Sequence, residues 1–316
     1  MEPLVQQAWG WLIALYLFLG GMGGATMIVA HYFYSVKKEK ALAAPGSLAA
    51  LIMVIVGTIF LILDLEKPEL FYLALAGFQT SSWIFRGTLI LSGFMLFAAL
   101  YAAGLLPWFK WVPWHDDEKI LSWLGLIASG FGLGVMTYTG VLLGVIKAIP
   151  FWNTPALPAL FVASALSTGI SAIQWINIAQ GKKRPESERQ RFRGYCTLLS
   201  KWDAIIVSTE LFILVVYYYL MSSGPVEAAT AVRITLFGDI RRAFMAYLNL
   251  ALLGGVLMLF VYETKTWARP GLEDGWKVSL EKSCFLPLLA ALLIMIAGLI
   301  LRVVILQAGV MAQLTP

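Results

Sequence analysis

Eight long apolar stretches divide this chain, and they constrain its fold more than any other feature. A helix needs about 20 mostly apolar residues to cross the hydrocarbon core of a bilayer. Stretches of roughly that length lie at about 9–34, 46–64, 82–106, 121–146, 156–179, 204–222, 243–262 and 285–308. Charged residues make up only 13% of the 316 residues, which leaves little for a soluble domain. The sequence therefore predicts an all-α, polytopic membrane protein, with residues 1–316 as one domain of eight transmembrane helices in two four-helix bundles.

Lysine and arginine are distributed unevenly among the loops between these spans. They concentrate in alternate loops, around residues 37–40, 110–119, 182–201 and 265–282. Because basic residues accumulate on the cytoplasmic side of membrane proteins, we expect these loops inside and both termini outside. The basic segment "GKKRPESERQRFRGYC" is then a cytoplasmic loop that sets topology, and no nucleic-acid partner is expected. The first stretch lacks a basic leader and a cleavage site, so it is expected to be a retained span.

Histidine and cysteine are too few for a redox centre within the spans. A haem b that carries electrons across a bilayer takes two axial ligands, usually paired histidines, and the chain has only His31 and His115. An iron–sulfur cluster normally takes four thiolates, and the chain has only Cys196 and Cys284. We therefore expect neither haem nor an iron–sulfur cluster in this chain.

Several polar side chains are expected near the outer ends of the spans. Tyr16 lies about 10 Å along the first span and Tyr138 about 12 Å from the outer end of the fourth, so the two reach a matching depth. Arg302, about 9 Å from the outer end of the last span, stays charged and needs an anion, a carbonyl or water, or must extend to the interface. Asp64, Glu66 and Glu69, at the outer end of the second span, are the available anions.

Three titratable groups are expected nearer the inner side. Glu210 follows Asp203 by about two helical turns, so both fall on one face, and His31 reaches a similar depth from the first span. An ionisable group inside a span is costly and indicates function by default, here a path for protons from the cytoplasm. The alternatives are a protonated helix contact for Glu210, a helix cap for Asp203 and a satisfied interfacial histidine for His31.

Two further patterns concern packing and partners. Gly20 and Gly24 form a GxxxG pair in the first span, and such small residues let membrane helices approach closely. The fourth span, with Gly130, Gly134, Gly140 and Gly144, is the expected neighbour.

The outer loops "KAIPFWNTPALP" and "FQTSSWIFRG" are rich in aromatic and turn residues. They predict a docking face for a partner outside the membrane; the residues that would form it are Trp83, Trp152 and Asn153, although tryptophan at this depth also occurs as an ordinary interface belt.

Five stretches, in this order along the chain, resemble the NrfD/PsrC family, the eight-helix membrane subunits of polysulfide-reductase-like respiratory complexes. They are "WLIALYLFLGGMGGA", "DLEKPELFY", "TSSWIFRGT", "YTGVLLGVIKAIPFWNTPALPALF" and "AGLILRVVILQAG". The resemblance implies a prokaryotic cytoplasmic membrane and a periplasmic, ferredoxin-like subunit with four [4Fe–4S] clusters. It also implies a molybdopterin or tungstopterin catalytic subunit. The membrane subunit then exchanges electrons between the clusters and menaquinone or another quinone near the outer surface.

The resemblance also assigns expected roles to residues. Tyr138 matches the family tyrosine that hydrogen-bonds a quinone carbonyl, while Leu15 stands where quinone-binding members carry a histidine. Either the adjacent Tyr16 takes over as donor, or the pocket is rebuilt, or quinone turnover is absent. The expected quinone site comprises Tyr138, Tyr16, Arg302 and Asp64. Three functions stay open: a quinone-reactive redox subunit, an anchor that conducts no electrons, and a proton-translocating subunit.

Overall fold

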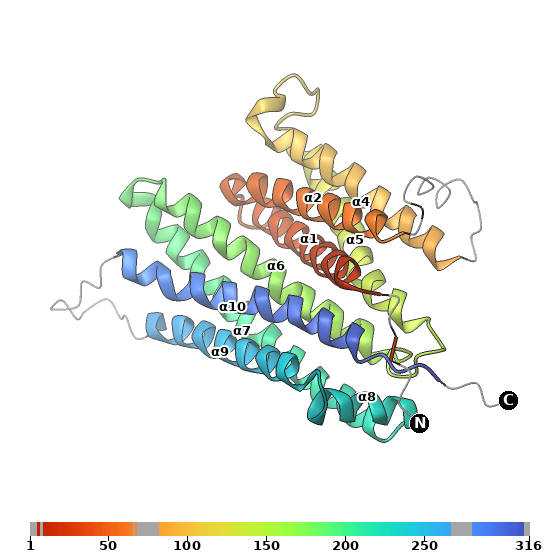
Figure 1. The fold of residues 1–316 in the computed structure, drawn as a ribbon. Coiled ribbons are helices and arrows are strands. Elements are labelled where there is room, and N and C mark those ends of the chain that lie inside the picture. The colour runs from red at the N-terminus through yellow and green to blue at the C-terminus, as the bar shows by residue number, and fades with distance from the viewer. Residues whose placement is uncertain (1–4, 7–8, 66, 68–81, 267–279, 313–316) are drawn as a thin grey trace.

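The computed structural model describes residues 5–6, 9–65, 67, 82–266 and 280–312. Eight of the described helices are long and apolar enough to cross a membrane, as predicted (Figure 1). Their bounds are α1 Trp11–Ser35, α2 Lys40–Leu63, α4 Trp83–Leu105, α5 Glu118–Gly144, α6 Ala156–Lys182, α7 Glu186–Ser222, α9 Arg241–Thr266 and α10 Leu280–Gln307. Two short helices, η2 (Pro107–Phe109) and α8 (Val226–Phe237), lie in the connections.

The eight long helices form two groups of four. In the first, α1, α2, α4 and α5 pack in a ring, and in the second, α6, α7, α9 and α10 do the same. Figure 1 shows the first group above the second, and α6 joins them by packing against α1 and α5. The predicted pair of four-helix bundles is therefore confirmed.

The two ends of the bundles differ in character. At one end, Val5 pairs with Val310 in an isolated β-bridge and Gln6 donates its backbone N–H to the Gly309 carbonyl, at 2.9 Å. We call this end the terminal face; α8 and the α5–α6 connection also lie there. The opposite end carries the α1–α2, α4–α5 and α6–α7 connections, which are rich in lysine and arginine. We call this end the basic face.

Helix α7, the sixth of the eight long helices, is much longer than the span predicted at 204–222. It begins at Glu186, so most of the basic segment expected as a loop is helical. The reason is tertiary: Phe192 and Leu199 of this extension are buried in a small apolar cluster with Phe33 of α1 and Leu42 of α2. Helix α8 was also missed, since its segment is too short to span a membrane.

Helix α1 lies at the centre of the molecule and touches α5 backbone to backbone. A Cβ atom on Gly24 would lie 2.5 Å from the carbonyl oxygen of Gly132, and one on Gly132 would lie 2.7 Å from that of Gly24. The predicted close approach of these helices is confirmed, but the glycines expected on α5 were wrong. Gly130 faces open space and Gly134 faces Ile90 of α4, because helix rotation, which spacing alone does not set, brings Gly132 to the contact.

Candidate functional site

Two buried tyrosines, one on α1 and one on α5, lie in the half of the first bundle nearer the terminal face. Tyr16 is 0% exposed and Tyr138 is 7% exposed, and the two are close enough to interact electrostatically. Tyr138 lies against Gly87 of α4, where a Cβ atom would be 1.9 Å from the tyrosine Cζ. Only glycine leaves room for the ring at this position. The structure therefore places the two tyrosines, which the sequence placed at matching depth, within electrostatic range of one another.

The Tyr16 hydroxyl has no hydrogen-bond partner within the described part of the chain. Buried polar groups are nearly always paired, so an orphaned hydroxyl indicates a water, a ligand or a functional role. Asp64, expected in the same site, caps the end of α2 and is partly buried, which raises the pKa of its carboxyl group. Within the described residues, the Asp64 carboxylate shows no interaction with either tyrosine. Glu66 and Glu69 lie outside the described residues.

Arg302 of α10 is 0% exposed, so it does not extend to the interface, and that alternative is wrong. Its guanidinium donates hydrogen bonds to the Ser164 hydroxyl and to the carbonyl oxygens of Gly298, at 3.0 Å, and Phe161, at 3.3 Å. It also lies 5.0 Å from the centre of the Phe161 ring. The carboxylate with which it interacts is Glu210, not the expected Asp64.

Glu210 of α7 lies in the same buried network. Its carboxylate accepts hydrogen bonds from Tyr247 of α9, at 3.0 Å, and from Ser167 of α6, at 3.3 Å. Ser164 also lies close enough to interact with Glu210, so its hydroxyl links the guanidinium of Arg302 to the surroundings of the carboxylate. The sequence had placed Arg302 with the tyrosines and Glu210 with an inner path; the structure joins them inside the second bundle.

Asp203 lies within α7 and is fully buried. It does not cap a helix, as one alternative had it, because α7 begins at Glu186. One carboxylate oxygen accepts a 2.7 Å hydrogen bond from Ser171 of α6, and the other has no partner among the described residues. Asp203 also interacts electrostatically with Glu210. The pair predicted to share a face therefore does so.

Polar side chains on one face of α6 connect these carboxylates to the basic face. They recur every three or four residues, all are buried, and they are Ser164, Ser167, Ser171, Gln174 and Asn177. With Asp203 and Glu210 they form what we call the α6–α7 seam. Their spacing is visible in "SALSTGISAIQWIN", so this helical polar stripe was a signal that the sequence interpretation missed.

The part of the seam nearer the basic face contains polar atoms that have no hydrogen-bond partner among the described residues. Gln174 donates to Ser200, at 3.4 Å, and Asn177 donates to the Phe192 carbonyl, at 3.0 Å. Within the described ranges, the side-chain oxygens of Gln174 and Asn177 have no partner, like one oxygen of Asp203. Three unpaired acceptors along one helix interface are the kind of site that buried water molecules occupy.

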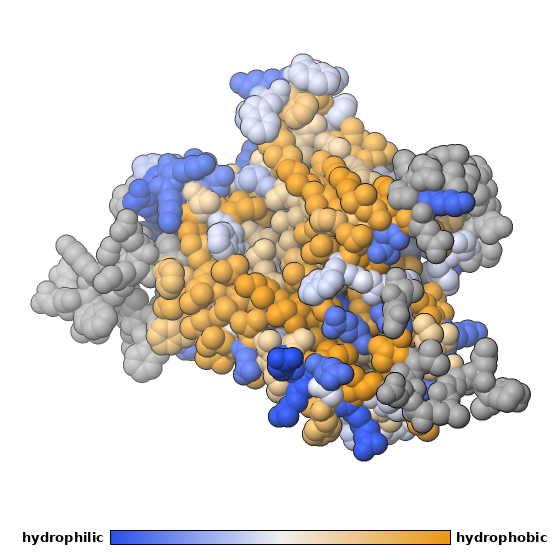
Figure 2. All heavy atoms as spheres, in the orientation of Figure 1, coloured by the Kyte–Doolittle hydropathy of each residue, from blue (hydrophilic) through white to orange (hydrophobic). Residues whose placement is uncertain are grey.

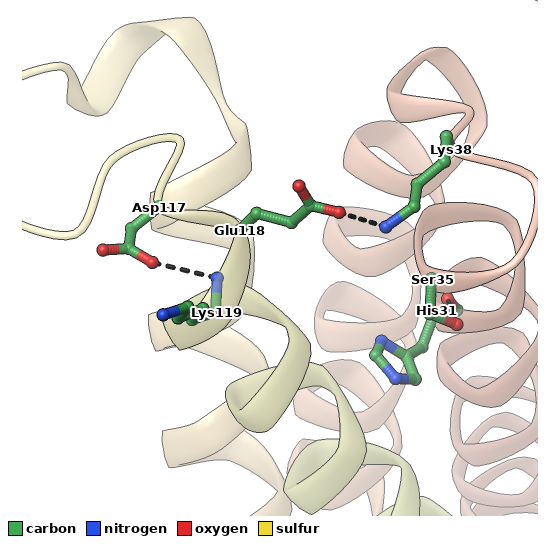
Figure 3. Close-up of polar contacts among 6 residues, drawn as sticks. All are labelled: His31, Ser35, Lys38, Asp117, Glu118 and Lys119. Carbon is green, nitrogen blue, oxygen red and sulfur yellow. Dashed lines mark hydrogen bonds and ion pairs between the residues drawn. The ribbon is translucent and has the colours of Figure 1, made fainter.

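His31 lies outside this seam. Its ring contacts Tyr101 edge-on, with centroids 5.8 Å apart, and a Cβ atom on Gly125 would lie 2.2 Å from its Nδ1. Figure 3 shows the ring beneath the ion pair between Lys38 and Glu118, on the α5 side of α1. The structure therefore places His31 in the first bundle, while Asp203 and Glu210 lie in the second.

The residues predicted to dock a partner differ in accessibility. Trp152 is 1% exposed; its indole N–H donates to the Ile305 carbonyl, at 2.8 Å, and its ring stacks on Trp9. It therefore supports the terminal face from within. Asn153 and Trp83 are exposed at this end, Asn153 donating to the Gly144 carbonyl. Among the described residues, no group of three or more histidine, cysteine, aspartate or glutamate side chains is arranged to hold a metal ion.

Comparisons with known proteins find one family over most of the protein. A family model described as "Polysulphide reductase, NrfD" matches residues 2–312. The protein is similar to "Protein NrfD homolog" of Haemophilus influenzae, with 27% identity over 73% of this sequence and 76% of the relative. It is 29% identical to the C chain of the polysulfide reductase of Wolinella succinogenes, over 71% of this sequence and 74% of the relative. "Protein NrfD" of Escherichia coli is 26% identical over 71% of this sequence and 75% of the relative.

Proposed function

This chain belongs to the NrfD family of polysulphide reductase proteins, and from that premise we propose that it is the membrane subunit of a respiratory oxidoreductase complex. It exchanges electrons between a partner subunit and a quinone, its substrate, at the terminal face, which is the periplasmic side of a prokaryotic cytoplasmic membrane. The name of the Wolinella succinogenes relative, one lettered component of a reductase, supports the role of a subunit. Eight apolar helices support the membrane setting.

The observation that carries this proposal is the orphaned hydroxyl of Tyr16 beside Tyr138. A quinone offers two carbonyl acceptors on a flat apolar ring, and two phenol donors in an apolar setting match that chemistry. Tyr16 then supplies the hydrogen bond that the histidine expected at Leu15 supplies elsewhere in the family. A donor aimed at a carbonyl that gains negative charge on reduction stabilises that charge most where water is excluded.

The partners follow from the same assignment. A ferredoxin-like subunit with four [4Fe–4S] clusters docks on the terminal face, where Trp83 and Asn153 are accessible. A molybdopterin or tungstopterin subunit completes the complex. In this proposal Arg302, which is hydrogen-bonded to Ser164 near Glu210, serves the second bundle and is left out of the quinone site.

A second candidate function is proton movement through the α6–α7 seam. Two buried carboxylates, Asp203 and Glu210, lie on this polar interface, and its unpaired oxygens favour ordered water. A proton relay inside a membrane usually consists of carboxylates and water molecules arranged in a chain. The seam leads from the basic face to the network of Glu210 and Arg302. Protons drawn from the cytoplasm would thus be available inside the membrane when quinone chemistry occurs on the other side.

Purification of the native complex tests the redox assignment. We expect an iron–sulfur subunit to co-purify with this protein, together with quinone. We also expect electron transfer between a soluble quinone analogue and the complex, inhibited by compounds that compete for quinone. A complex that assembles but shows neither bound quinone nor inhibitor-sensitive turnover would instead support the alternative of an anchor without redox activity.

A further inference from the structure

An aromatic connection projects from the basic face and has no part in the proposed redox or proton function. Residues 106–117 join α4 to α5 and include η2. Trp108 is 73% exposed, Trp111 is 77% exposed, and Trp123, shortly after the start of α5, is 67% exposed. We call these three residues the tryptophan cluster. Figure 1 shows the connection, coloured gold, extending beyond the ends of the neighbouring helices.

The connection is held in place by specific contacts, so its exposed indoles do not result from a loose segment. The indole N–H of Trp114 donates to the Leu100 carbonyl, at 3.1 Å, and a Cβ atom on Gly104 would lie 2.9 Å from that indole. Asp116 donates its backbone N–H to the Gly104 carbonyl and pairs with Lys40 of α2, at 2.9 Å. A fixed segment therefore presents the tryptophan cluster outward.

The position of the cluster is the boundary between hydrocarbon and water. Exposed apolar side chains of α4 and α5, such as Leu96 and Leu126, form the lipid-facing surface that ends at this connection. In Figure 2 the hydrophobic surface gives way to hydrophilic and intermediate residues at the tip of the same extension. Indoles favour this depth because the ring is apolar while its N–H can donate a hydrogen bond.

Two exposed lysines accompany the indoles. Lys110 lies between Trp108 and Trp111, and Lys119 lies one turn before Trp123. Lysines beside the hydrocarbon boundary are attracted to anionic lipid headgroups. Exposed indoles with neighbouring lysines, on a surface that continues the lipid-facing helices, fit a phospholipid interface; two of the nearby carboxylates, Asp116 and Glu118, are paired with Lys40 and Lys38.

We propose that residues 107–123 form a membrane-interface anchor. The tryptophan cluster lies among the phospholipid headgroups of the leaflet on the basic side, with Lys110 and Lys119 at the lipid phosphates. This anchor fixes the depth and tilt of the first bundle, and it is independent of the redox assignment.

Fluorescence quenching in lipid nanodiscs tests the proposal on the full-length protein. The bilayer contains phosphatidylcholine and phosphatidylglycerol with bromine atoms high on the acyl chains, and iodide is the aqueous quencher. We compare wild type with the double variant Trp108→Phe/Trp111→Phe. The fluorescence that the variant loses should be the part that brominated lipid quenches in wild type, and the part that iodide quenches should stay unchanged. Loss confined to iodide-quenched emission would overturn the proposal and indicate a surface for a water-soluble partner. Trp152→Phe is the control: its indole is 1% exposed, so emission lost there is quenched by neither agent.

The lysine contribution has its own test. Quenching by brominated lipid is compared in wild type and in Lys110→Gln/Lys119→Gln, with and without phosphatidylglycerol. We expect wild type to be quenched more strongly when the anionic lipid is present and the double variant to lose that difference. Equal quenching of wild type in the two bilayers would overturn the lysine contribution. Unfolding transitions matching wild type establish that each variant is folded.

Discussion

Arg302 and Glu210 should depend on one another for stability, because Ser164 links them in a fully buried site. Arg302→Met removes a charged donor that makes three hydrogen bonds and leaves the carboxylate without its cation. Removing one partner of a buried charge pair costs roughly 3–5 kcal/mol of the free energy of unfolding. The Glu210→Gln change in the same protein removes the uncompensated charge, so the double variant should recover about 1–3 kcal/mol relative to the sum of the single changes.

The assay is a double-mutant cycle on protein unfolded by a denaturing detergent in mixed micelles. Arg233→Met, an exposed arginine on α8, is the matched control and should change stability by no more than about 0.5 kcal/mol. If the Arg302 and Glu210 effects add to within about 0.5 kcal/mol, the two groups are not coupled and the proposed dependence is refuted.

Gly132→Leu should separate α1 from α5 and prevent stable assembly, measured as yield and unfolding midpoint, whereas Gly130→Leu, which faces open space, should not. Glu210→Gln should abolish proton movement in liposomes; an unchanged ratio of protons to electrons would leave Glu210 with a structural role only. The ion pair with Lys40 lowers the pKa of the Asp116 carboxyl, so the stability it adds is present above the ordinary carboxyl pKa of about 3.9 and is lost as pH falls through the lowered value. In Asp116→Asn, this loss of stability at acid pH should be absent from unfolding curves measured across pH. The lost free energy of unfolding is small because both groups are exposed.

The sequence was sufficient for the number of spans, because crossing a bilayer requires a length of apolar residues that can be counted along the chain. The match in depth between Tyr16 and Tyr138 followed from the helical rise in the same way. Depth does not determine rotation, however. Which helix Arg302 faces depends on how α10 is turned against α6, and that turn results from packing between distant residues.

Two other features, the start of α7 and the polar face of α6, were not predicted from the sequence, for different reasons. The helical start of α7 is charged, and it is stabilised by burying Phe192 and Leu199 against α1 and α2, a contact that no local pattern contains. The polar face of α6 was visible as serines, a glutamine and an asparagine at helical spacing. Uncharged side chains in a span are a weaker signal than ionisable ones, so of the α6–α7 seam only Asp203 and Glu210 were predicted.

The most direct test of the central claim is the rate of quinone-linked electron transfer in the purified complex carrying Tyr16→Phe. A hydrogen bond to an acceptor that gains charge contributes about 1.5–3 kcal/mol, so we predict a loss of roughly tenfold to a hundredfold, with the complex still assembled. Tyr101→Phe is the matched control, since that hydroxyl is equally buried and, among the described residues, equally unpaired, but lies near the basic face. Turnover in Tyr16→Phe equal to wild type would contradict the assignment of Tyr16 to the quinone.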